Sequence, residues 1–360
     1  MPVCLWLLRG RSSTWTKRFA HQEGPIDLLR KWAQRIAQRS DVKRVVYPAA
    51  NAFLSLWGNI RAVGYDIEDT VVVAASPRGG STWLAELMAS RPRTTILWEP
   101  LHLGNNPECR EHGFGWQNYI PEGADWEEQR CYLKRVLTGC DLSTRLLTSL
   151  ELNPRALLSP GGTYVAKFVN ANMILPRMVG AFSVPAIHMI RHPCAVVSSQ
   201  IKHGSWAHLE KSNLTIPDGL FQDYPHLSSV FEGIEAHEEL LAFEWAVQNY
   251  VPLSHTEPLP WYLTTYECMV MEGPEEVQRI SQFLGVPLEE AINNLKTPSA
   301  TASGESIDRQ RERLTKWKTN LKPDQADRVL RVAHEVGITC YTDAPVPDET
   351  ELPRHAGTST

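Results

Sequence analysis

A continuous apolar run that ends in a glycine turn is the feature that most constrains the fold of this 360-residue chain. Residues 71–75 are all valine or alanine, and Gly79 and Gly80 come directly before a helical segment that opens at Ser81. A run that is apolar at every position is typical of a strand buried on both faces of a parallel sheet. The N–H groups of the turn and of the first helical turn then converge and can bind one anion. The segment therefore predicts a phosphate site, to which Arg78 adds a fixed positive charge.

A second strand-to-helix segment begins at Ile187. Its mostly apolar run ends at Ile190, Arg191 follows directly, and Ser199 lies eight residues after Arg191. Either segment alone is about as compatible with an ordinary turn, because glycine and proline mark many connections between strands and helices. The presence of both in one chain is more specific, since each places a cation at the end of a buried strand, where α/β proteins bind ligands.

The glycine turn differs from the common ATP- or GTP-binding loop, which consists of Gly, four residues, Gly, Lys and then Ser or Thr. Here Ala75 occupies the place of the first glycine, and Ser81 rather than lysine follows Gly80. The sequence Pro-Arg-Gly-Gly-Ser-Thr-Trp at residues 77–83 instead resembles the 5'-phosphosulfate loop of sulfotransferases that use 3'-phosphoadenosine 5'-phosphosulfate (PAPS). The segment 191–199 resembles the motif with which the same family binds the 3'-phosphate.

This resemblance implies a role for each motif residue. Arg78 would contact the phosphosulfate and stabilise the leaving oxygen, while Arg191 and Ser199 would hold the 3'-phosphate, to which arginine offers bidentate geometry. Tyr266, directly after the last strand-like run, resembles a family aromatic residue that meets adenine. The cofactor-binding residues implied in this way are Arg78, Gly79, Gly80, Ser81, Thr82, Trp83, Arg191, Ser199 and Tyr266.

The match to the family is imperfect at two positions and in one segment. His192 stands where the family usually has Asp or Asn, and Cys194 where a basic residue is common. We expect these differences to change the capping of the turn more than the contact with phosphate. Residues 309–318 resemble the family's closing segment through Trp317 but lack its Arg-Lys-Gly signature.

Sulfonyl transfer requires positioning, charge stabilisation and a base. Glu99 precedes Pro100 at the end of a strand-like run, and carbohydrate sulfotransferases often have a similar Glu-Pro pair, so Glu99 is the first candidate for the base. The alternative is a structural salt bridge from Glu99 to a cation of the site. His102 is the second candidate, because the cytosolic phenol type uses histidine for this step. Lys167 resembles a family lysine near the transferred group, and a lysine in an apolar strand must pair or reach solvent. The predicted catalytic residues are Glu99, Arg78, Lys167 and His102.

Strand-like and helical segments alternate along the chain. This order predicts a three-layer α/β fold with a central, mostly parallel sheet, and the resemblance implies the topology of P-loop nucleotide kinases. Residues 103–128 and 205–233 are expected to be long loops over the site. The expected strands cover residues 71–75, 95–98, 164–169, 186–190 and 261–265, and the expected helices 82–90, 126–137, 195–202 and 235–250.

The domain prediction has three parts: a basic, partly helical extension at 1–65, a sulfotransferase domain at 66–345 and a disordered tail at 346–360, which is rich in Pro, Thr and Glu. Residues 1–50 hold ten Lys or Arg against three acids, a net charge of +7, although the whole chain carries −5. Apolar residues at helical spacing in 28–36 lie among these cations, which leaves peripheral membrane contact open beside ordinary packing. No stretch approaches the roughly 18 apolar residues that span a bilayer.

The seven cysteines form no C-x-x-C pair, which favours a reducing compartment. We therefore expect a cytoplasmic protein, with an N-terminal targeting segment left open because the first 22 residues contain no acid. The acidic overall balance argues against nucleic acid as a partner.

The sequence as a whole predicts a PAPS-dependent sulfotransferase, closer to the carbohydrate or bacterial type than to the cytosolic phenol type. It would transfer the sulfonyl group to a hydroxyl of a sugar, glycolipid or small metabolite, release 3'-phosphoadenosine 5'-phosphate (PAP), and need no metal. Two alternatives remain at this point. One is a nucleotide kinase, and the other is a non-catalytic protein that binds 3'-phosphorylated nucleotides.

Overall fold

The computed structural model describes residues 40–147, 154–159, 161–297 and 310–355. The chain divides into two compact units, Met1–Phe53 and Leu54–Thr360. In the first unit, the described residues 40–53 form the beginning of helix α2 (Ser40–Ala62), on which Tyr47 and Phe53 are exposed. The basic segment 28–36 lies outside the described residues.

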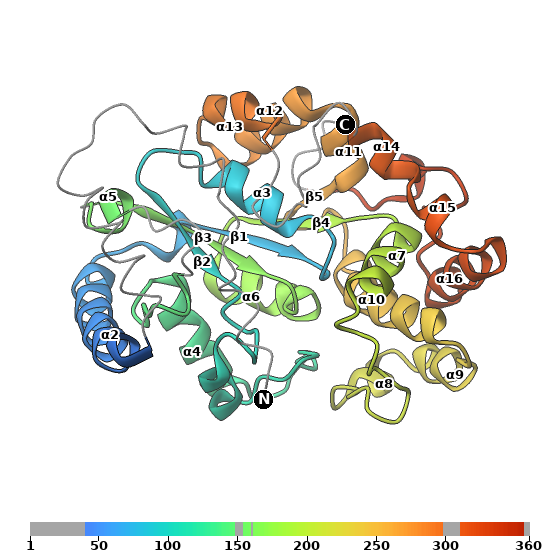
Figure 1. Ribbon diagram of the computed structural model, residues 1–360, viewed down its shortest axis with the longest axis horizontal. Helices are drawn as coiled ribbons and strands as arrows, with labels where there is room; N and C mark the ends of the chain where they lie inside the picture. Colours follow the sequence, from blue (N-terminus) through green and yellow to red (C-terminus); the bar gives the residue numbers. More distant parts are fainter. Residues whose placement is uncertain (1–39, 148–153, 160, 298–309, 356–360) are drawn as a thin grey trace. The chain divides into compact units, whose positions relative to one another are not determined.

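The second unit is built on one five-stranded sheet, which Figure 1 shows in the middle of the fold. The strand order is β2-β3-β1-β4-β5, and every neighbouring pair is parallel. This confirms the predicted α/β class with a parallel sheet. The strands are β1 (Thr70–Ala75), β2 (Thr94–Trp98), β3 (Thr163–Phe168), β4 (Ala186–Ile190) and β5 (Tyr262–Thr265).

The central strand β1 is buried at every position, as its unbroken apolar sequence predicts. Successive side chains of a strand point to opposite faces, so Val71 and Val73 belong to one hydrophobic cluster while Val72 and Ala74 belong to the other. Helices cover both faces, which gives three layers (Figure 1).

The two helical layers differ in composition. The layer that packs with Val71 and Val73 contains α3 (Ser81–Met88), α11 (Tyr266–Met271), α12 (Gly273–Leu284), α13 (Glu289–Asn294) and α14 (Gln310–Thr315). The opposite layer contains α4 (Glu127–Leu137), α6 (Leu175–Phe182), α7 (Pro193–His203), α10 (His237–Leu253), α15 (Trp317–Asn320) and α16 (Pro323–Val336), together with short α5 (Pro154–Leu157).

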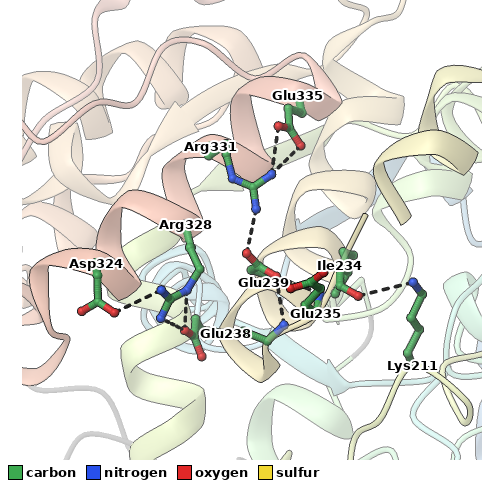
Figure 2. Close-up of polar contacts among 10 residues, drawn as sticks. Lys211, Ile234, Glu235, Glu238, Glu239, Asp324, Arg328, Arg331 and Glu335 are labelled. Atoms are coloured by element: carbon green, nitrogen blue, oxygen red, sulfur yellow. Dashed lines mark hydrogen bonds and ion pairs between the residues drawn. The ribbon is translucent and has the colours of Figure 1, made fainter. Parts of the chain in front are cut away.

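Two charged pairs connect α10 and α16 (Figure 2). Arg328 donates to Glu238 and Arg331 donates to Glu239, both across the helix interface. The second oxygen of Glu239 accepts the N–H groups of Glu235 and Ala236 at 2.9 Å each, so this carboxylate also caps the start of α10. Burial alone would raise the pKa of Glu239, but these bonds and the guanidinium lower it below its usual value.

The long segments predicted as loops contain short helices. In 103–128 there is η4 (Pro107–His112), and in 205–233 there are α8 (Leu220–Asp223) and α9 (His226–Glu232). Leu220 and Leu227 are buried under these turns, so the segments pack on the core instead of arching freely over the site. The physical reason is that a few apolar residues without helical periodicity are enough to fix one or two turns.

The structure describes contacts near both predicted domain boundaries, which themselves stay predictions. Leu54 is buried, and Trp57 and Arg61 each donate to the carbonyl of Leu157, so this part of α2 packs in the unit that contains the sheet. At the other end, the structure describes residues 346–355, which fall within the segment predicted to be a tail. Backbone hydrogen bonds that the composition does not reveal hold them, such as the N–H of Leu259 to the carbonyl of Arg354 at 2.9 Å. No helix in the described part of the chain combines the length and apolar character that crossing a membrane requires.

Candidate active site

The turn between β1 and α3 has the backbone of an anion-binding loop. Arg78 and Gly80 adopt left-handed conformations, with φ of 71° and 106°, and the N–H of Gly79 donates to the carbonyl of Ser76 at 2.8 Å. Such alternation of conformations turns successive N–H groups towards one concave surface. A left-handed arginine is uncommon and costs energy, which is typical of a functional turn.

Helix α3 begins directly behind this loop. Its first i to i−4 hydrogen bond runs from the N–H of Leu84 to the carbonyl of Gly80 at 3.2 Å. The N–H groups of residues 81–83 lie before this bond, so the helix itself offers them no acceptor. Ser81 and Thr82 are buried at the same end. Backbone donors, two hydroxyl groups and the positive end of the helix dipole are thus gathered where the sequence predicts the 5'-phosphosulfate loop.

Arg78 and Arg191, which are 113 positions apart, meet because β1 and β4 are neighbours in the sheet. The Arg191 guanidinium donates to the carbonyl of Arg78 at 3.1 Å, and Nε of Arg78 donates to the hydroxyl of Ser199 at 3.0 Å. Desolvation and the positive charge of Arg191 together lower the pKa of Arg78. In the described residues neither guanidinium has a carboxylate partner within ion-pair distance. Two adjacent cations without an acid form a site for a multiply charged anion.

Tyr266 packs beneath one of these cations, Arg191. The Arg191 guanidinium lies 4.2 Å from the centre of its ring, and the ring of Trp83 meets it edge-on at 5.7 Å. A methyl group added at Gly80 would come within 2.7 Å of the Tyr266 ring, so this position requires glycine for its close approach as well as for its φ. The structure thus brings together Tyr266, Trp83 and both phosphate motifs, while the contact of Tyr266 with adenine stays a prediction.

A second charged pair lies at the carboxyl ends of β2 and β3. Trp98 pairs with Lys167 in the sheet register, and Glu99 directly follows, so the Lys167 ammonium reaches the Glu99 carboxylate in an ion pair. The ammonium also lies 4.2 Å from the centre of the Trp98 ring. Lys167 is only 1% exposed. Its burial lowers its pKa, which the carboxylate of Glu99 opposes.

Glu99 is held in an unusual conformation. Its φ of 45° is left-handed, and its N–H donates to the carbonyl of Lys167 at 2.8 Å. One carboxylate oxygen is ion-paired with Lys167, and Oε2 accepts the Asn105 amide at 3.2 Å. A carboxylate oxygen can accept more than one hydrogen bond, so Glu99 keeps acceptor capacity for a substrate proton. Both roles considered from the sequence, a salt-bridge partner and a carboxylate available as a base, are therefore compatible with the same geometry.

His102 is oriented as a donor. Its Nδ1 accepts the N–H of Asn105 at 3.2 Å, which places the proton of the neutral ring on Nε2. Burial lowers the pKa of His102, so the neutral form prevails at pH 7. The ring also meets Trp116 edge-on at 5.0 Å. Because its only basic nitrogen is already engaged, His102 is a weaker candidate for the base than Glu99.

A family model described as the sulfotransferase domain matches residues 68–336, which is most of the chain and includes every residue of the site above. The chain belongs to the sulfotransferase domain family. Comparison with curated proteins finds no match.

Several solved structures resemble this sulfotransferase. The sulfotransferase domain of the Synechococcus PCC 7002 olefin synthase is 16% identical, with 74% of this chain and 93% of that domain covered and a TM-score of 0.40. The sulfotransferase domain from the curacin biosynthetic pathway is 19% identical, with 72% and 95% covered and a TM-score of 0.39. Mouse sulfotransferase SULT7A1, solved with PAP, is 14% identical, with 78% and 90% covered and a TM-score of 0.37.

The two departures from the family motif have clear structural consequences. Nδ1 of His192 accepts the N–H of Cys194 at 3.2 Å, so histidine caps α7 as an aspartate would. Its Nε2 lies 3.0 Å from the carbonyl of Thr342, and its ring stacks on Trp317 at 4.7 Å. Burial lowers the pKa of His192 to about 4, which keeps the ring neutral. Cys194 is buried in the core, so this position does not add the positive charge that a basic residue would bring.

Sequence reasoning missed two groups in this sulfotransferase. Asn105 bonds both Glu99 and His102, and its only signal is its place in a turn that follows the Glu-Pro pair. The amide of Asn249 on α10 donates to the hydroxyl of Ser76, the first residue after β1, at 2.9 Å. No pattern within the α10 sequence identifies Asn249, because its partner is distant in the chain. Within the described residues, no group of three or more His, Cys, Asp or Glu side chains gathers as metal ligands would.

Proposed function

We propose that this sulfotransferase uses PAPS as its donor and transfers the sulfonyl group to an acceptor hydroxyl. The observation that carries the proposal is the meeting of Arg78, Arg191 and Ser199 at the start of α3, with no acid paired to either arginine in the described residues. A doubly phosphorylated donor supplies anions at two points, and a site with two cationic motifs and a helix N-terminus matches that distribution.

The two motifs divide the work. The loop 76–83 would hold the 5'-phosphosulfate through backbone N–H groups, and Arg191 with Ser199 would hold the 3'-phosphate. The contact between Arg78 and Ser199 at 3.0 Å supports a single bound molecule that spans both, since it makes the two motifs one continuous surface. Tyr266, packed against Arg191 and Gly80, would border the nucleoside.

For the transfer step we assign the proton to Glu99. The acceptor oxygen attacks sulfur in line, its proton passes to the Glu99 carboxylate, and the bond between sulfur and the 5'-phosphate oxygen breaks as the new bond forms. Lys167 and Arg78 would stabilise the negative charge that develops on the phosphate oxygen as PAP leaves. The buried ion pair supports this assignment, because it keeps a carboxylate and an ammonium side by side at the strand ends, where ligands bind in such sheets.

The two alternatives considered from the sequence are less well supported. A nucleotide kinase conflicts with membership of the sulfotransferase domain family. A binding protein without catalysis would not need a glutamate such as Glu99, whose backbone is left-handed and whose carboxylate is ion-paired to the buried Lys167. The Glu99-Pro100 pair and arginine at position 78 favour a sugar or other aliphatic hydroxyl over a phenol as the acceptor.

The donor assignment is tested by thermal shift with PAP and with AMP. A ligand stabilises the native protein in proportion to the logarithm of its concentration over Kd. Charge-assisted hydrogen bonds to the 3'-phosphate are each worth about 1.5 to 3 kcal/mol, so PAP should raise Tm more than AMP at equal concentration. Arg191→Ala should remove most of this difference, whereas Arg130→Ala, which breaks an exposed pair with Glu127, should leave it intact. Equal shifts for PAP and AMP in the unmodified protein would refute the assignment.

A further inference from the structure

A cluster of polar side chains surrounds the middle of α10. Trp245 contacts Tyr341, which contacts His192 just beyond the end of β4, and Asn249 reaches Ser76 just beyond the end of β1. The helix then leads into β5, so it runs from the carboxyl edge of the sheet towards the amino edge. Glu244 lies five residues before Asn249, which places it about 7.5 Å further along the helix axis. It therefore stands beyond the strand ends, at the edge of the sheet that carries Glu99 and Arg78.

The loop that contacts His102 is bonded to this part of α10. The Gln117 amide donates to Oε1 of Glu244 at 2.5 Å, and the Gln248 amide donates to Oε1 of Gln117 at 3.1 Å. Trp116, the preceding residue, is the one that meets the His102 ring. The cluster is thus connected to His102 through the adjacent residues Trp116 and Gln117.

The segment that follows β3 extends the same cluster. The Asn118 amide donates to the carbonyl of Asn170 at 2.9 Å, and the Asn170 amide donates to the carbonyl of Leu101, the residue before His102. The Asn172 amide donates to Asn249 on α10 at 3.3 Å. Three segments that are distant in sequence therefore present polar groups next to the loop that bears Glu99 and His102.

The hydrogen bonds of this cluster are unbalanced. Four of its oxygens are buried and have no donor, although the amide nitrogen of each Asn or Gln among them already donates, which fixes how those groups are turned. Gln248 is 3% exposed and Asn172 is 1% exposed, so bulk solvent does not satisfy them. The four atoms are Glu244 Oε2, Gln248 Oε1, Asn170 Oδ1 and Asn172 Oδ1. Buried acceptors without a protein donor are costly to leave unpaired, so these oxygens are available to accept hydrogen bonds from a bound ligand.

Because the four unpaired atoms are oxygens, they favour a ligand group that donates hydrogen bonds. No ion pair joins Glu244 to a cation in the described part of the chain, and burial raises the pKa of Glu244 to about 7. An ammonium group has three donors and no acceptor, whereas a hydroxyl adds lone pairs where acceptors are already in excess. A cation would in addition restore the charge balance of the carboxylate.

We propose that Glu244, with Gln248 and Asn172, binds a protonated amino group of the acceptor, so that the acceptor is an amino alcohol whose hydroxyl is sulfonated. This rests on the proposed function for the transfer itself, but the amine site can be tested by binding alone. Binding an ammonium favours the ionised carboxylate, so affinity for the amine should rise between about pH 6 and pH 8, where an alkylamine with a pKa of about 10 stays protonated.

The test compares linear amino alcohols with diols of the same chain length. Each amino alcohol, with one terminal amine and one terminal hydroxyl, and its matching diol are titrated calorimetrically into the PAP-saturated protein, and sulfonyl transfer to each is measured in parallel. We expect the amino alcohol to bind at least about tenfold more tightly than the diol at the favoured length, since a charge-assisted pair exceeds about 1.4 kcal/mol. Glu244→Gln should bring the ratio close to one, with a higher KM and little change in kcat. Glu232→Gln, an exposed carboxylate on α9, should keep the ratio.

Two results would overturn the amine site. The first is an unmodified protein that binds amino alcohols and diols equally at every length, and the second is Glu244→Gln with its preference unchanged. Failure of the proposed function gives a different pattern, in which PAP stabilises no more than AMP and no acceptor is sulfonated. Retained PAP binding by Glu244→Gln shows that the variant is folded.

Discussion

At the scale of single residues, two charged residues of the candidate site have the uncommon left-handed backbone conformation. Arg78 and Glu99 are two of four non-glycine residues with positive φ in the described chain, and they follow β1 and β2 respectively. A left-handed conformation costs energy for a residue other than glycine, and such residues cluster at functional sites. The backbone at both positions is therefore set by the turns that follow the two strands.

Glu99→Gln keeps the shape of this side chain and removes its basicity. General-base assistance is worth about 10²- to 10⁴-fold, so kcat should fall by that factor while PAP affinity stays within a few-fold. Arg191→Ala should do the opposite, weakening the nucleotide most. Steady-state kinetics and PAP titration separate the two effects. If Glu99→Gln retains near-normal kcat and His102→Ala does not, the base is His102.

Gly80→Ala tests the close approach of the loop to Tyr266. The added methyl group would lie 2.7 Å from the ring at a φ of 106°, so we expect a loss of about 1 to 3 kcal/mol in unfolding free energy and weaker PAP binding. Gly180→Ala is the matched control, because this exposed glycine in α6 has open space around it. That substitution should stabilise the helix by about 0.5 to 1 kcal/mol. Denaturant unfolding measures both, and equal effects would contradict the strain at Gly80.

At the scale of elements, the position of α10 decides much of the site. In its C-terminal half, Asn249 donates to Ser76, and in its middle, Glu244 accepts from Gln117. Its first turn is bonded to α16 by the charged pairs in Figure 2. One helix thus contacts the turn after β1, the segment around Gln117 and helix α16. A change at the α10–α16 interface is therefore expected to reach the site through the helix.

Glu239→Ala should lower the free energy of unfolding more than the loss of an exposed ion pair in this interface does. It removes a cap that accepts two backbone N–H groups and a pair with Arg331, and loss of such a cap costs about 0.5 to 2 kcal/mol. Asp324→Ala removes an exposed partner of Arg328, and surface pairs of this kind are worth about 0 to 1 kcal/mol. Urea unfolding of the two variants gives the comparison. Indistinguishable midpoints would show that the cap does not contribute.

At the scale of the whole molecule, neutral histidines hold distant segments of the chain to the sheet. His188 on β4 bonds Asn249, and His192 after β4 bonds the carbonyls of Thr342 and Ala344 near the C-terminus. Burial lowers the pKa of each histidine to about 4. The native protein therefore resists protonation of both rings, whereas the unfolded chain takes up protons at an ordinary pKa of about 6.5.

This difference makes stability depend on pH with a definite sign. Between about pH 6.5 and pH 4 the unfolded state binds more protons at each histidine, so unfolding free energy falls as the pH falls, by about 1.4 kcal/mol per pH unit for each ring. His192→Asn keeps a capping side chain without the titration, and its slope in this window should be smaller by one ring's share. Chemical unfolding at several pH values measures the slopes. A slope equal to that of the unmodified protein would contradict a neutral, buried His192.

Local patterns in the chain predicted the strands, and the resemblance of its motifs to known sulfotransferases predicted the family. The apolar run 71–75 has no polar position to face solvent, which favours a central strand, and the glycines after it favour a turn into a helix with free N–H groups. The sequence also singled out Arg78, Glu99, Lys167 and Arg191, because a charged side chain in or next to a buried strand must find a partner or reach solvent. The structure brings these residues to the carboxyl edge of the sheet as expected.

The partners of these charges, in contrast, follow from the packing of the whole fold. The ion pair of Glu99 with Lys167 depends on the register of β2 against β3, and the contact of Arg78 with Ser199 depends on β4 lying beside β1. The amide and carboxylate cluster around Glu244 is assembled from three segments, none of which has a distinctive local pattern. The physical reason is that a strand or a turn is encoded by neighbours in sequence, whereas a hydrogen-bond partner across the fold is fixed by packing, which a local pattern does not contain.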